Sequence, residues 1–471
     1  MRFRIRVCLY CIMVLLAVPS YQAFASISVK AGAKPSAVLT TVQAETFVNE
    51  LVPLVEQYSG RKFITPPIVK LTTANQVAPV LARELIPQYR RLFPGKSEKS
   101  LISLADANSL AISTHLLGKY GTYAKILYIV PENFRPRMQD ARVDPKHEAA
   151  FVKLIIAHEL THALQDQYVG LASMLNKSGN TDQSLAVSST IEGHAIYVQD
   201  KIANELNMQD SQKEYDRAIG AGVSDDPVEK LMGSMESKLM SDTYLAGRDF
   251  ITWQMLNGGP EQVWKVLSAP PVKSSMILHP ETYAPTMGKS VDYKSLLSGV
   301  EKSFGPRKWN VVNVEVGEMQ LRALYNDLEP TTRDAVLTDF DHAQALAAMD
   351  GTSVASVTII AVKDPKILPK LITGLGDVCK KNVENINREG ATKIKDFTSG
   401  SFTCIKSDAN SMICFKMTSG AVTLPNKFVR VVRGRVVVEI YCQAVEVSDV
   451  RLGAIAESIF KKLPLEYCKL Q

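Results

Sequence analysis

The residues best suited to chemistry gather at His158-Glu159-Leu160-Thr161-His162, where two histidines stand four residues apart and a glutamate follows the first. On an α-helix, positions i and i+4 share a face, so both imidazoles can reach one metal ion. Glu159 lies about a quarter-turn round, where its carboxylate can face an open metal position and act as a base. Composition alone produces this pattern in roughly one or two of every hundred chains of this length, so its context decides.

The flanking sequence predicts that the motif lies on a buried helix. Asp144-Pro145 is a favoured pair for a helix start, and Gly170 suits a helix end. Apolar residues occupy most of the surface in between: Phe151, Val152, Leu154, Ile155, Ile156, Leu160, Ala163, Leu164 and Tyr168. Because unpaired polar groups are costly to bury, the histidines and the glutamate need a common partner, and a metal ion is one.

A second helix, predicted from about Asp182 to Leu206, offers a third ligand. A catalytic zinc ion takes three protein ligands and keeps one position open. Glu192 is the favoured candidate and His194 is its rival. The two point to nearly opposite faces of a helix, so we expect only one to bind; the remaining alternative is that neither does. Gly193 predicts a close approach, which we expect to be with the first site helix.

Two other segments are candidates for lining a cleft. Tyr123 to Val130 is β-rich, and it is either a strand that pairs with an extended substrate or a core strand without that role. The segment from Ser274 to Tyr283 carries His279 and Tyr283 four residues apart. It is either a wall of the cleft or an ordinary surface loop.

The N-terminus resembles an export signal. Arginines within the first six residues precede an apolar run from Val7 to Val18, and Ala23-Phe24-Ala25 is a typical cleavage site. The alternative is a membrane anchor, but the run is short for a span. We therefore predict a cleaved signal peptide over residues 1–25, no stable membrane span in the mature chain, and a secreted or periplasmic protein.

Composition places the chain among ordinary globular proteins. Its 471 residues are 46% hydrophobic and 22% charged, with a net charge of +6, and suffice for two or three domains. No basic run interleaved with aromatic residues is present, so we expect no nucleic-acid partner. The sequence does not indicate an oligomeric state.

The cysteines fit an oxidising compartment. Two of the seven lie in the signal segment, and the others are Cys379, Cys404, Cys414, Cys442 and Cys468. We expect two disulfides and one leftover thiol. Cys404 and Cys414 flank a turn-like segment and could face each other across a hairpin; the second pairing stays open.

The order of predicted elements indicates an α+β fold. A mainly helical part comes first, with helical patterns as late as Val311–Tyr325 and an Ala-rich stretch, His342–Met349. A strand at Val354–Val362, several short β-rich runs and a closing helix at Val450–Leu463 then predict an antiparallel sheet with helices. We expect one domain over residues 26–335 and a smaller α+β domain over residues 350–471, with the boundary between residues 328 and 352.

The motifs resemble those of secreted bacterial zinc metallopeptidases of the gluzincin type, the thermolysin-like class whose third ligand is a glutamate on a second helix. The resemblance covers about residues 40 to 325. Its motifs are His158 to Gln167 (HELTHALQDQ), Glu192 to Ala195 (EGHA), and Ser274 to Tyr283 (SSMILHPETY). It implies a zincin-like metallopeptidase domain and Zn²⁺ as the cofactor.

Carried over residue by residue, the resemblance makes His158, His162 and Glu192 the zinc ligands and Glu159 the general base. It makes His279 and Tyr283 candidate donors to the transition state.

Positions around these residues bear on the outer support of the metal. Asp166, one turn after the second ligand, is either a partner that orients a histidine or a capping or solvated aspartate. The chain also departs from the pattern, with His194 two residues and Ile196 four residues after Glu192, where aspartates are usual. These departures leave second-shell support, by His194 among others, open.

The expected function is that of an exported endopeptidase that hydrolyses peptides or proteins. The alternative is a non-catalytic partner-binding protein on a zincin scaffold. The intact Glu159 favours chemistry, because a purely structural metal site needs no base.

Overall fold

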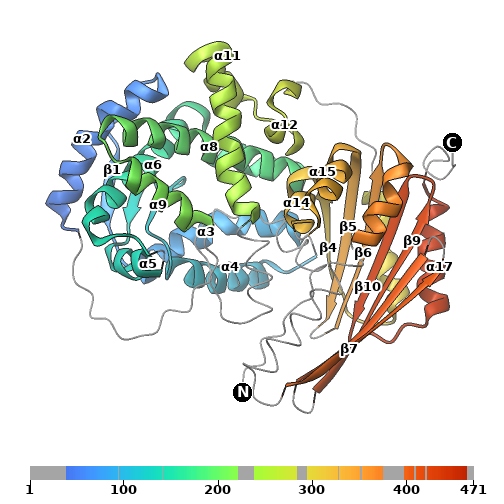
Figure 1. The fold of residues 1–471 in the computed structure, drawn as a ribbon. Helices are drawn as coiled ribbons and strands as arrows, with labels where there is room; N and C mark the ends of the chain where they lie inside the picture. Colours follow the sequence, from blue (N-terminus) through green and yellow to red (C-terminus); the bar gives the residue numbers. More distant parts are fainter. Residues whose placement is uncertain are drawn as a thin grey trace. The chain divides into compact units, whose positions relative to one another are not determined.

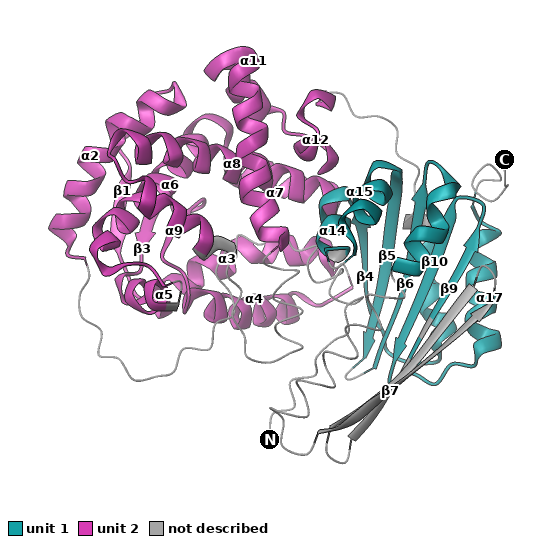
Figure 2. Cartoon of the chain, viewed as in Figure 1, with its two compact units in different colours: residues 1–18, 225–235, 288–471 teal, residues 19–224, 236–287 magenta. Residues whose placement is uncertain are grey.

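The computed structural model describes residues 39–93, 95–140, 142–220, 238–283, 294–326, 328–350, 353–374, 397–407, 410–419 and 422–463. The predicted signal peptide, Cys379 and Cys468 lie outside this part of the chain. The chain divides into a mainly helical unit and a sheet-bearing unit (Figure 2). The first comprises residues 19–224 and 236–287, and the second comprises residues 1–18, 225–235 and 288–471. An α+β fold is thus confirmed.

The helical unit is built mostly of long helices around a small sheet (Figure 1). Its described helices are α2 (Thr41–Ser59), α3 (Ala74–Leu92), α4 (Glu98–Ser113), α5 (Phe134–Asp140), α6 (Glu148–Val169), α7 (Leu171–Asn176), α8 (Thr181–Glu205), α9 (Gln209–Gly220), α11 (Gly247–Ser268) and α12 (Ser275–Leu278). A π-helical segment, η3 (Asp242–Ala246), leads directly into α11.

Helix α6 carries the predicted motif and begins and ends as its sequence indicates. The Asp144 carboxylate accepts a hydrogen bond from the Lys146 backbone at 3.0 Å and starts a 3₁₀ turn that runs into α6. Gly170 ends the helix in the left-handed region at φ +68°. From Leu154 to Asp166 every residue of α6 is buried. The helix is therefore a central element of this unit rather than a surface helix.

A three-stranded sheet covers the site helix. It comprises β1 (Ile68–Leu71), β2 (Gly118–Gly121) and β3 (Ile126–Ile129), in the order β1-β3-β2. Strand β3 pairs with β1 in parallel and with β2 antiparallel. The strand predicted at Tyr123–Val130 is β3, which is central and has no free edge within this sheet. The expectation that this strand pairs with a substrate is therefore wrong for β3, and β1 and β2 form the two edges of the sheet.

The sheet-bearing unit contains a seven-stranded antiparallel sheet in the order β4-β5-β6-β10-β9-β8-β7. The strands are β4 (Asn310–Val316), β5 (Phe340–Asp350), β6 (Ser353–Val362), β7 (Phe397–Ser407), β8 (Asn410–Ser419), β9 (Val422–Arg433) and β10 (Val436–Gln443). The described helices are α13 (Lys294–Leu297), α14 (Glu318–Leu324), α15 (Pro330–Thr338) and α17 (Asp449–Phe460). Alternate residues of the central strands and the apolar face of α17 form one hydrophobic core.

Two segments expected to be helical are strands. His342–Met349 lies within β5, and the first part of Val311–Tyr325 forms β4; only its second part is helical, as α14. Strand β4 pairs with β5, and β5 with β6, so tertiary pairing overrides the helical preference of the alanines. Because β4 belongs to this sheet, the longest stretch of this unit starts at residue 288, earlier than the expected boundary between residues 328 and 352.

The predicted hairpin between Cys404 and Cys414 exists, but its register does not place them opposite each other. Cys404 pairs with Ile413, and Cys414 with Thr403. The side chains of both cysteines lie outside the described part of the structure. Cys442, on β10, is a buried free thiol, and burial raises its pKa to about 12.

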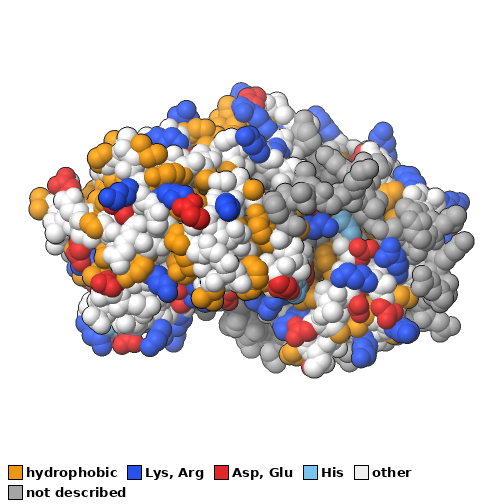
Figure 3. Space-filling model, turned by 90° about the horizontal axis from the view of Figure 1, so that it is seen from above, with side chains coloured by type: hydrophobic (Ala, Val, Ile, Leu, Met, Phe, Trp, Pro, Cys, Tyr) orange, Lys and Arg blue, Asp and Glu red, His pale blue; other side chains and the backbone are white. Residues whose placement is uncertain are grey.

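Within the described ranges, no helix combines the length and the apolar character that crossing a membrane requires. On the face shown in Figure 3, acidic and basic side chains of the described residues are interspersed with hydrophobic ones rather than separated by sign.

Candidate metal centre

Helices α6 and α8 pack against each other and bring the predicted ligands together. The Nε2 atom of His158 lies 3.0 Å from Oε2 of Glu192 and 3.0 Å from Nε2 of His162. Nε2 of His162 lies 3.4 Å from the same glutamate oxygen. The three side chains are buried, with 4%, 4% and 6% of the residue exposed for His158, His162 and Glu192. These residues form a group that can hold a metal ion.

The spacing of the three ligand atoms fits a metal of zinc's size. Bond lengths of about 2.0–2.1 Å and tetrahedral angles require ligand atoms roughly 3.3 Å apart. The observed separations of 3.0, 3.0 and 3.4 Å are close to this value. Little movement of α6 against α8 would be needed to form the site.

The electrostatics of the group favour an ionised carboxylate beside the imidazoles. Burial by itself raises the pKa of Glu192, but His162 and His158 more than offset this and hold that pKa below its usual value. Burial lowers the pKa of His162, and the charge of Glu192 outweighs it and raises that pKa. Glu192 therefore supplies a negative charge that either a proton on His162 or a bound cation can balance.

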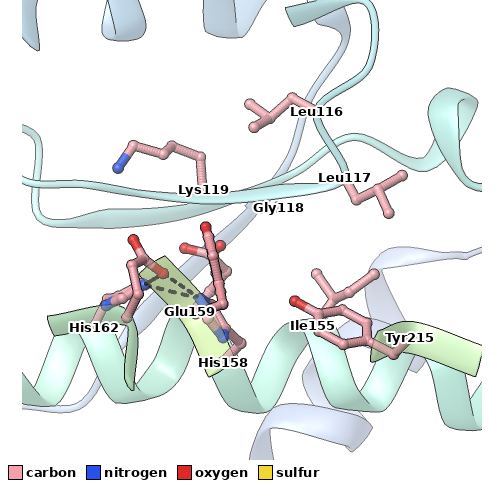
Figure 4. A pocket seen from close by; sticks show the side chains of 11 residues that line it. Leu116, Leu117, Gly118, Lys119, Ile155, His158, Glu159, His162 and Tyr215 are labelled. Carbon is pink, nitrogen blue, oxygen red and sulfur yellow. Dashed lines mark hydrogen bonds and ion pairs between the residues drawn. The ribbon is translucent and has the colours of Figure 1, made fainter. Parts of the chain in front are cut away.

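Glu159 lies beside the ligand group without belonging to it. It lines the same small cavity as His158, His162 and Glu192, and is 9% exposed (Figure 4). The backbone N–H of Tyr120, on β2, donates a hydrogen bond of 2.6 Å to its Oε2. Gly118 is needed at this approach, because a Cβ there would lie 2.9 Å from Ile155 and 3.1 Å from Glu159. The edge strand β2 thus holds the carboxylate beside the site.

The cavity at this site is narrow, with a volume of about 40 Å³. Its walls come from β2 and the segment before it, from α6 and α8, and from two tyrosines: Leu116, Leu117, Gly118, Lys119, Ile155, His158, Glu159, His162, Glu192, Tyr215 and Tyr244. Such a volume is of the order of a single water molecule or ion. The cavity therefore matches the ligand group rather than a bulky substrate.

The sequence reasoning did not find Tyr215 and Tyr244. Tyr244 lies in the π-helical segment η3, and its ring stacks on the His158 imidazole with centroids 6.0 Å apart. Figure 4 shows the Tyr215 hydroxyl on the side of the cavity facing Glu159. Burial, followed by nearby carboxylates, raises both pKa values well above their usual range, so both hydroxyls stay protonated and can donate. No local motif marks either residue; a π-helical turn is the structural signal for Tyr244.

His194 lies close to the metal group but is not a ligand, as its place opposite Glu192 on the helix predicts. Its Nδ1 lies 3.0 Å from Nε2 of Gln165, whose Oε1 lies 2.9 Å from Nδ1 of His162. Burial, with a smaller contribution from His162, lowers the pKa of His194 to about 3, so its ring is neutral. The structure places His194 in the outer support of the site, through Gln165.

The Asp166 carboxylate bonds groups other than the two histidines of the motif. Its Oδ1 accepts from the Leu171 backbone at 2.9 Å, and its Oδ2 accepts from the Tyr120 hydroxyl at 2.7 Å. Lys125 forms an ion pair with the same oxygen. Asp166 therefore caps the helix turn and ties β2 to α6, which is the capping alternative rather than the orienting one.

His279 and Tyr283 are not among the residues that line the described cavity. The Tyr283 hydroxyl donates to the Ala269 carbonyl at 2.6 Å, and its ring packs against Phe250. His279 ends the short helix α12. The expectation that these two side chains face the metal is not met, because their loop is held against α11.

Gly193 does mark a close approach, but with a different helix from the one expected. A Cβ at Gly193 would lie 2.1 Å from the Gly247 carbonyl carbon, and one at Gly247 would lie 2.2 Å from the Ser189 oxygen. The two glycines let α8 meet the start of α11 backbone to backbone. This contact supports α8 at the residue next to Glu192.

Comparisons with known proteins leave the family of the chain open. No protein-family model matches it, and neither does any curated protein. A solved structure of a candidate hydrolase with a novel fold from Chloroflexus aurantiacus is similar at 14% identity and a TM-score of 0.38, covering 58% of this chain and 96% of that one. The extracellular domain of PknH from Mycobacterium tuberculosis is similar at 14% identity and a TM-score of 0.24, covering 37% and 97%. Both similarities are too weak to indicate a function for this chain.

Proposed function

We propose that this protein is an exported zinc-dependent endopeptidase. One observation carries the proposal: His158, His162 and Glu192 converge from two helices, and a separate carboxylate, Glu159, lines the same cavity. Three ligands with a neighbouring base are the arrangement of a catalytic site, whereas a structural site closes its fourth position with another ligand.

The ligand types favour zinc over harder cations. Two imidazole nitrogens and one carboxylate suit zinc, whereas calcium and magnesium prefer oxygen ligands throughout. When bound, zinc would supply a Lewis acid that polarises a carbonyl oxygen and lowers the pKa of an attacking water. His158, His162 and Glu192 would hold it.

Glu159 is the group suited to move the proton. Its Oε2 is occupied by the Tyr120 N–H at 2.6 Å, which fixes the carboxylate beside the ligands. The other oxygen is then the one to accept a proton from water and to deliver it to the leaving amine. The hydroxyls of Tyr215 and Tyr244 replace His279 and Tyr283 as candidate donors to the developing oxyanion, because both tyrosines line the cavity.

The edge strand β2 supports a peptide as the substrate. The Tyr120 N–H points away from β3, since it donates to Glu159. Backbone groups alternate in direction along an antiparallel strand, so those of Gly118 point to the same side. An extended peptide could add along this edge, with its main chain beside Glu159.

The experiment compares the mature chain with its Glu159→Gln variant for zinc content and for hydrolysis of casein. We expect one zinc in both and hydrolysis by the parent alone, because the variant keeps the ligands but loses the base. Glu148→Gln is the matched control, since Glu148 lies in the first turn of the same helix, away from the cavity. Retained hydrolysis in Glu159→Gln would refute this role of Glu159, and His158→Ala should lose zinc.

The narrow cavity favours a second candidate, a non-catalytic partner-binding protein on the same scaffold. A volume of about 40 Å³ leaves no room for a peptide unless β2 or a tyrosine moves. One zinc in both proteins, with no hydrolysis of casein or of a broad peptide library by either, would favour this alternative. The N-terminal signal would then export a binding protein rather than an enzyme.

A further inference from the structure

The side chain of Gln165 connects the two site helices through three hydrogen bonds. Its Oε1 lies 2.9 Å from Nδ1 of His162, and its Nε2 lies 2.9 Å from the Ile191 carbonyl oxygen and 3.0 Å from Nδ1 of His194. Gln165 and His194 are both completely buried. Ile191 directly precedes Glu192, so this one amide contacts a ligand on α6 and the backbone beside the ligand on α8.

The chemistry of these partners gives the hydrogen bonds one direction. A backbone carbonyl can only accept, so the Gln165 NH₂ group must face Ile191. The amide oxygen then faces His162, whose Nδ1 must donate a proton to it. In a neutral imidazole this leaves the lone pair on Nε2, the atom that faces Glu192 and His158. The second amide proton goes to Nδ1 of His194.

We propose that Gln165 and His194 form a neutral relay that positions His162 for metal binding and sets the distance between the ligands of α6 and α8. This inference rests on the metal site of the proposed function. Metal-binding histidines usually donate their other N–H to a carboxylate, a carbonyl or water, and such partners tune affinity. Here the partner is an amide, which adds no charge, and its own second proton is held by a buried histidine.

Of the two histidine ligands, the relay contacts only His162. Nδ1 of His158 has no hydrogen-bond partner among the described residues. Beyond Gln165, the His194 ring packs edge to face against the Trp264 ring, with the ring centroids 5.5 Å apart and an interplanar angle of 75°. His162 is therefore the ligand whose orientation is set before a metal arrives.

The test measures zinc affinity by competition with a chromophoric chelator. Gln165→Met has a similar length but removes all three hydrogen bonds, and we expect affinity to fall about 10–100-fold. Gln165→Glu keeps an acceptor oxygen for His162 but cannot donate to the Ile191 carbonyl or to His194, so we expect its affinity to lie between those of the parent and Gln165→Met. The matched control is Gln199→Met, because Gln199 is an equally buried glutamine on α8 that bonds Gln212 rather than a metal ligand.

The outcomes separate the relay from the proposed function. A parent that binds no zinc would refute the metal site itself. If the parent binds zinc, the relay alone would be refuted by Gln165→Met binding zinc as tightly as the parent does. It would also be refuted by Gln165→Glu binding zinc no more tightly than Gln165→Met does. Equal losses in Gln165→Met and Gln199→Met would also refute it, because they would indicate a general loss of packing.

A second measurement uses the parent protein alone and therefore does not depend on whether a variant folds. Long-range nitrogen-15 spectra of the zinc-loaded parent, labelled at histidine, report which ring nitrogen carries the proton. The relay requires the His194 proton on Nε2, with Nδ1 free to accept. A proton on Nδ1 of His194 would overturn the proposed direction of the hydrogen bonds.

Discussion

Replacing Gly193 by alanine should push α8, which carries the proposed ligand Glu192, away from α11. The new Cβ would lie 2.1 Å from the Gly247 carbonyl carbon, 2.3 Å from its oxygen and 2.6 Å from the Arg248 nitrogen, whereas ordinary contacts begin at 3.4 Å. All three are backbone atoms, which cannot rotate out of the way as a side chain can. To lengthen the closest distance from 2.1 Å to an ordinary contact of 3.4 Å, α8 and α11 must move apart by more than 1 Å. The shift falls on the residue next to Glu192.

The magnitude follows from two opposing terms. Overpacking costs about 1–3 kcal/mol and sometimes more, whereas alanine gains about 1 kcal/mol over glycine inside a helix. The backbone clash places Gly193→Ala at or beyond the upper end of the first term, so we expect a net loss of about 2 kcal/mol or more in the free energy of unfolding. At about 2–4 °C per kcal/mol in a domain of this size, Tm should fall by about 4–8 °C.

The assay is thermal unfolding with and without zinc, together with chelator competition. Because Glu192 moves with α8, we expect zinc affinity to fall at least about tenfold as well. Gly453→Ala in α17 is the control, since a Cβ at Gly453 meets nothing within 4 Å and should stabilise by up to about 1 kcal/mol. Unchanged stability and zinc affinity in Gly193→Ala would refute the close packing of α8 on α11.

Three further predictions concern groups outside the proposed site. Arg430 and Glu439 form an ion pair of 2.6 Å with both side chains at most 1% exposed. Glu439→Leu should destabilise the sheet-bearing unit by about 3–5 kcal/mol in urea unfolding, because it leaves the charge of Arg430 buried and unpaired. The double variant with Arg430→Met should recover most of this loss of stability, and a purely additive loss in the double variant would contradict the prediction. Burial raises the pKa of Asp200 to about 6, above the unfolded value of about 3.9, so the folded protein loses stability as pH rises between these values. Asp200→Asn should therefore stabilise the protein more at pH 8 than at pH 4 in thermal melts, and an equal effect at both would count against it. Cys442, 1% exposed, should resist alkylation in the folded protein and react after unfolding, as peptide mass spectrometry would show; ready labelling of the native protein would place this thiol at the surface instead.

The sequence by itself determined the ligand set of the candidate metal site. The spacing of His158 and His162 is local geometry, because a helix always brings positions i and i+4 to one face. The caps at Asp144 and Gly170 are equally local, and they placed α6 within a few residues. Glu192 required only that a second helix be recognised and that its two polar candidates point apart.

Only the tertiary structure determined which residues surround and support the site. Tyr215 and Tyr244 come from separate elements, α9 and η3, and nothing in their neighbouring sequence indicates which cavity they reach. The same holds for the edge strand β2, which was not predicted from the sequence. The sequence also placed His279 and Tyr283 at the metal by resemblance, whereas the loop packs against α11.

The strands of the second unit show the same division. The alanines of β5 favour a helix locally, and only pairing with β4 and β6 makes them a strand. Gly193 illustrates both sides: a glycine inside a helix predicted a close approach, but the partner proved to be Gly247 rather than α6. Local geometry acts over a few residues and can be read from spacing, whereas the choice of neighbour depends on how all the elements pack, which no short stretch of sequence contains.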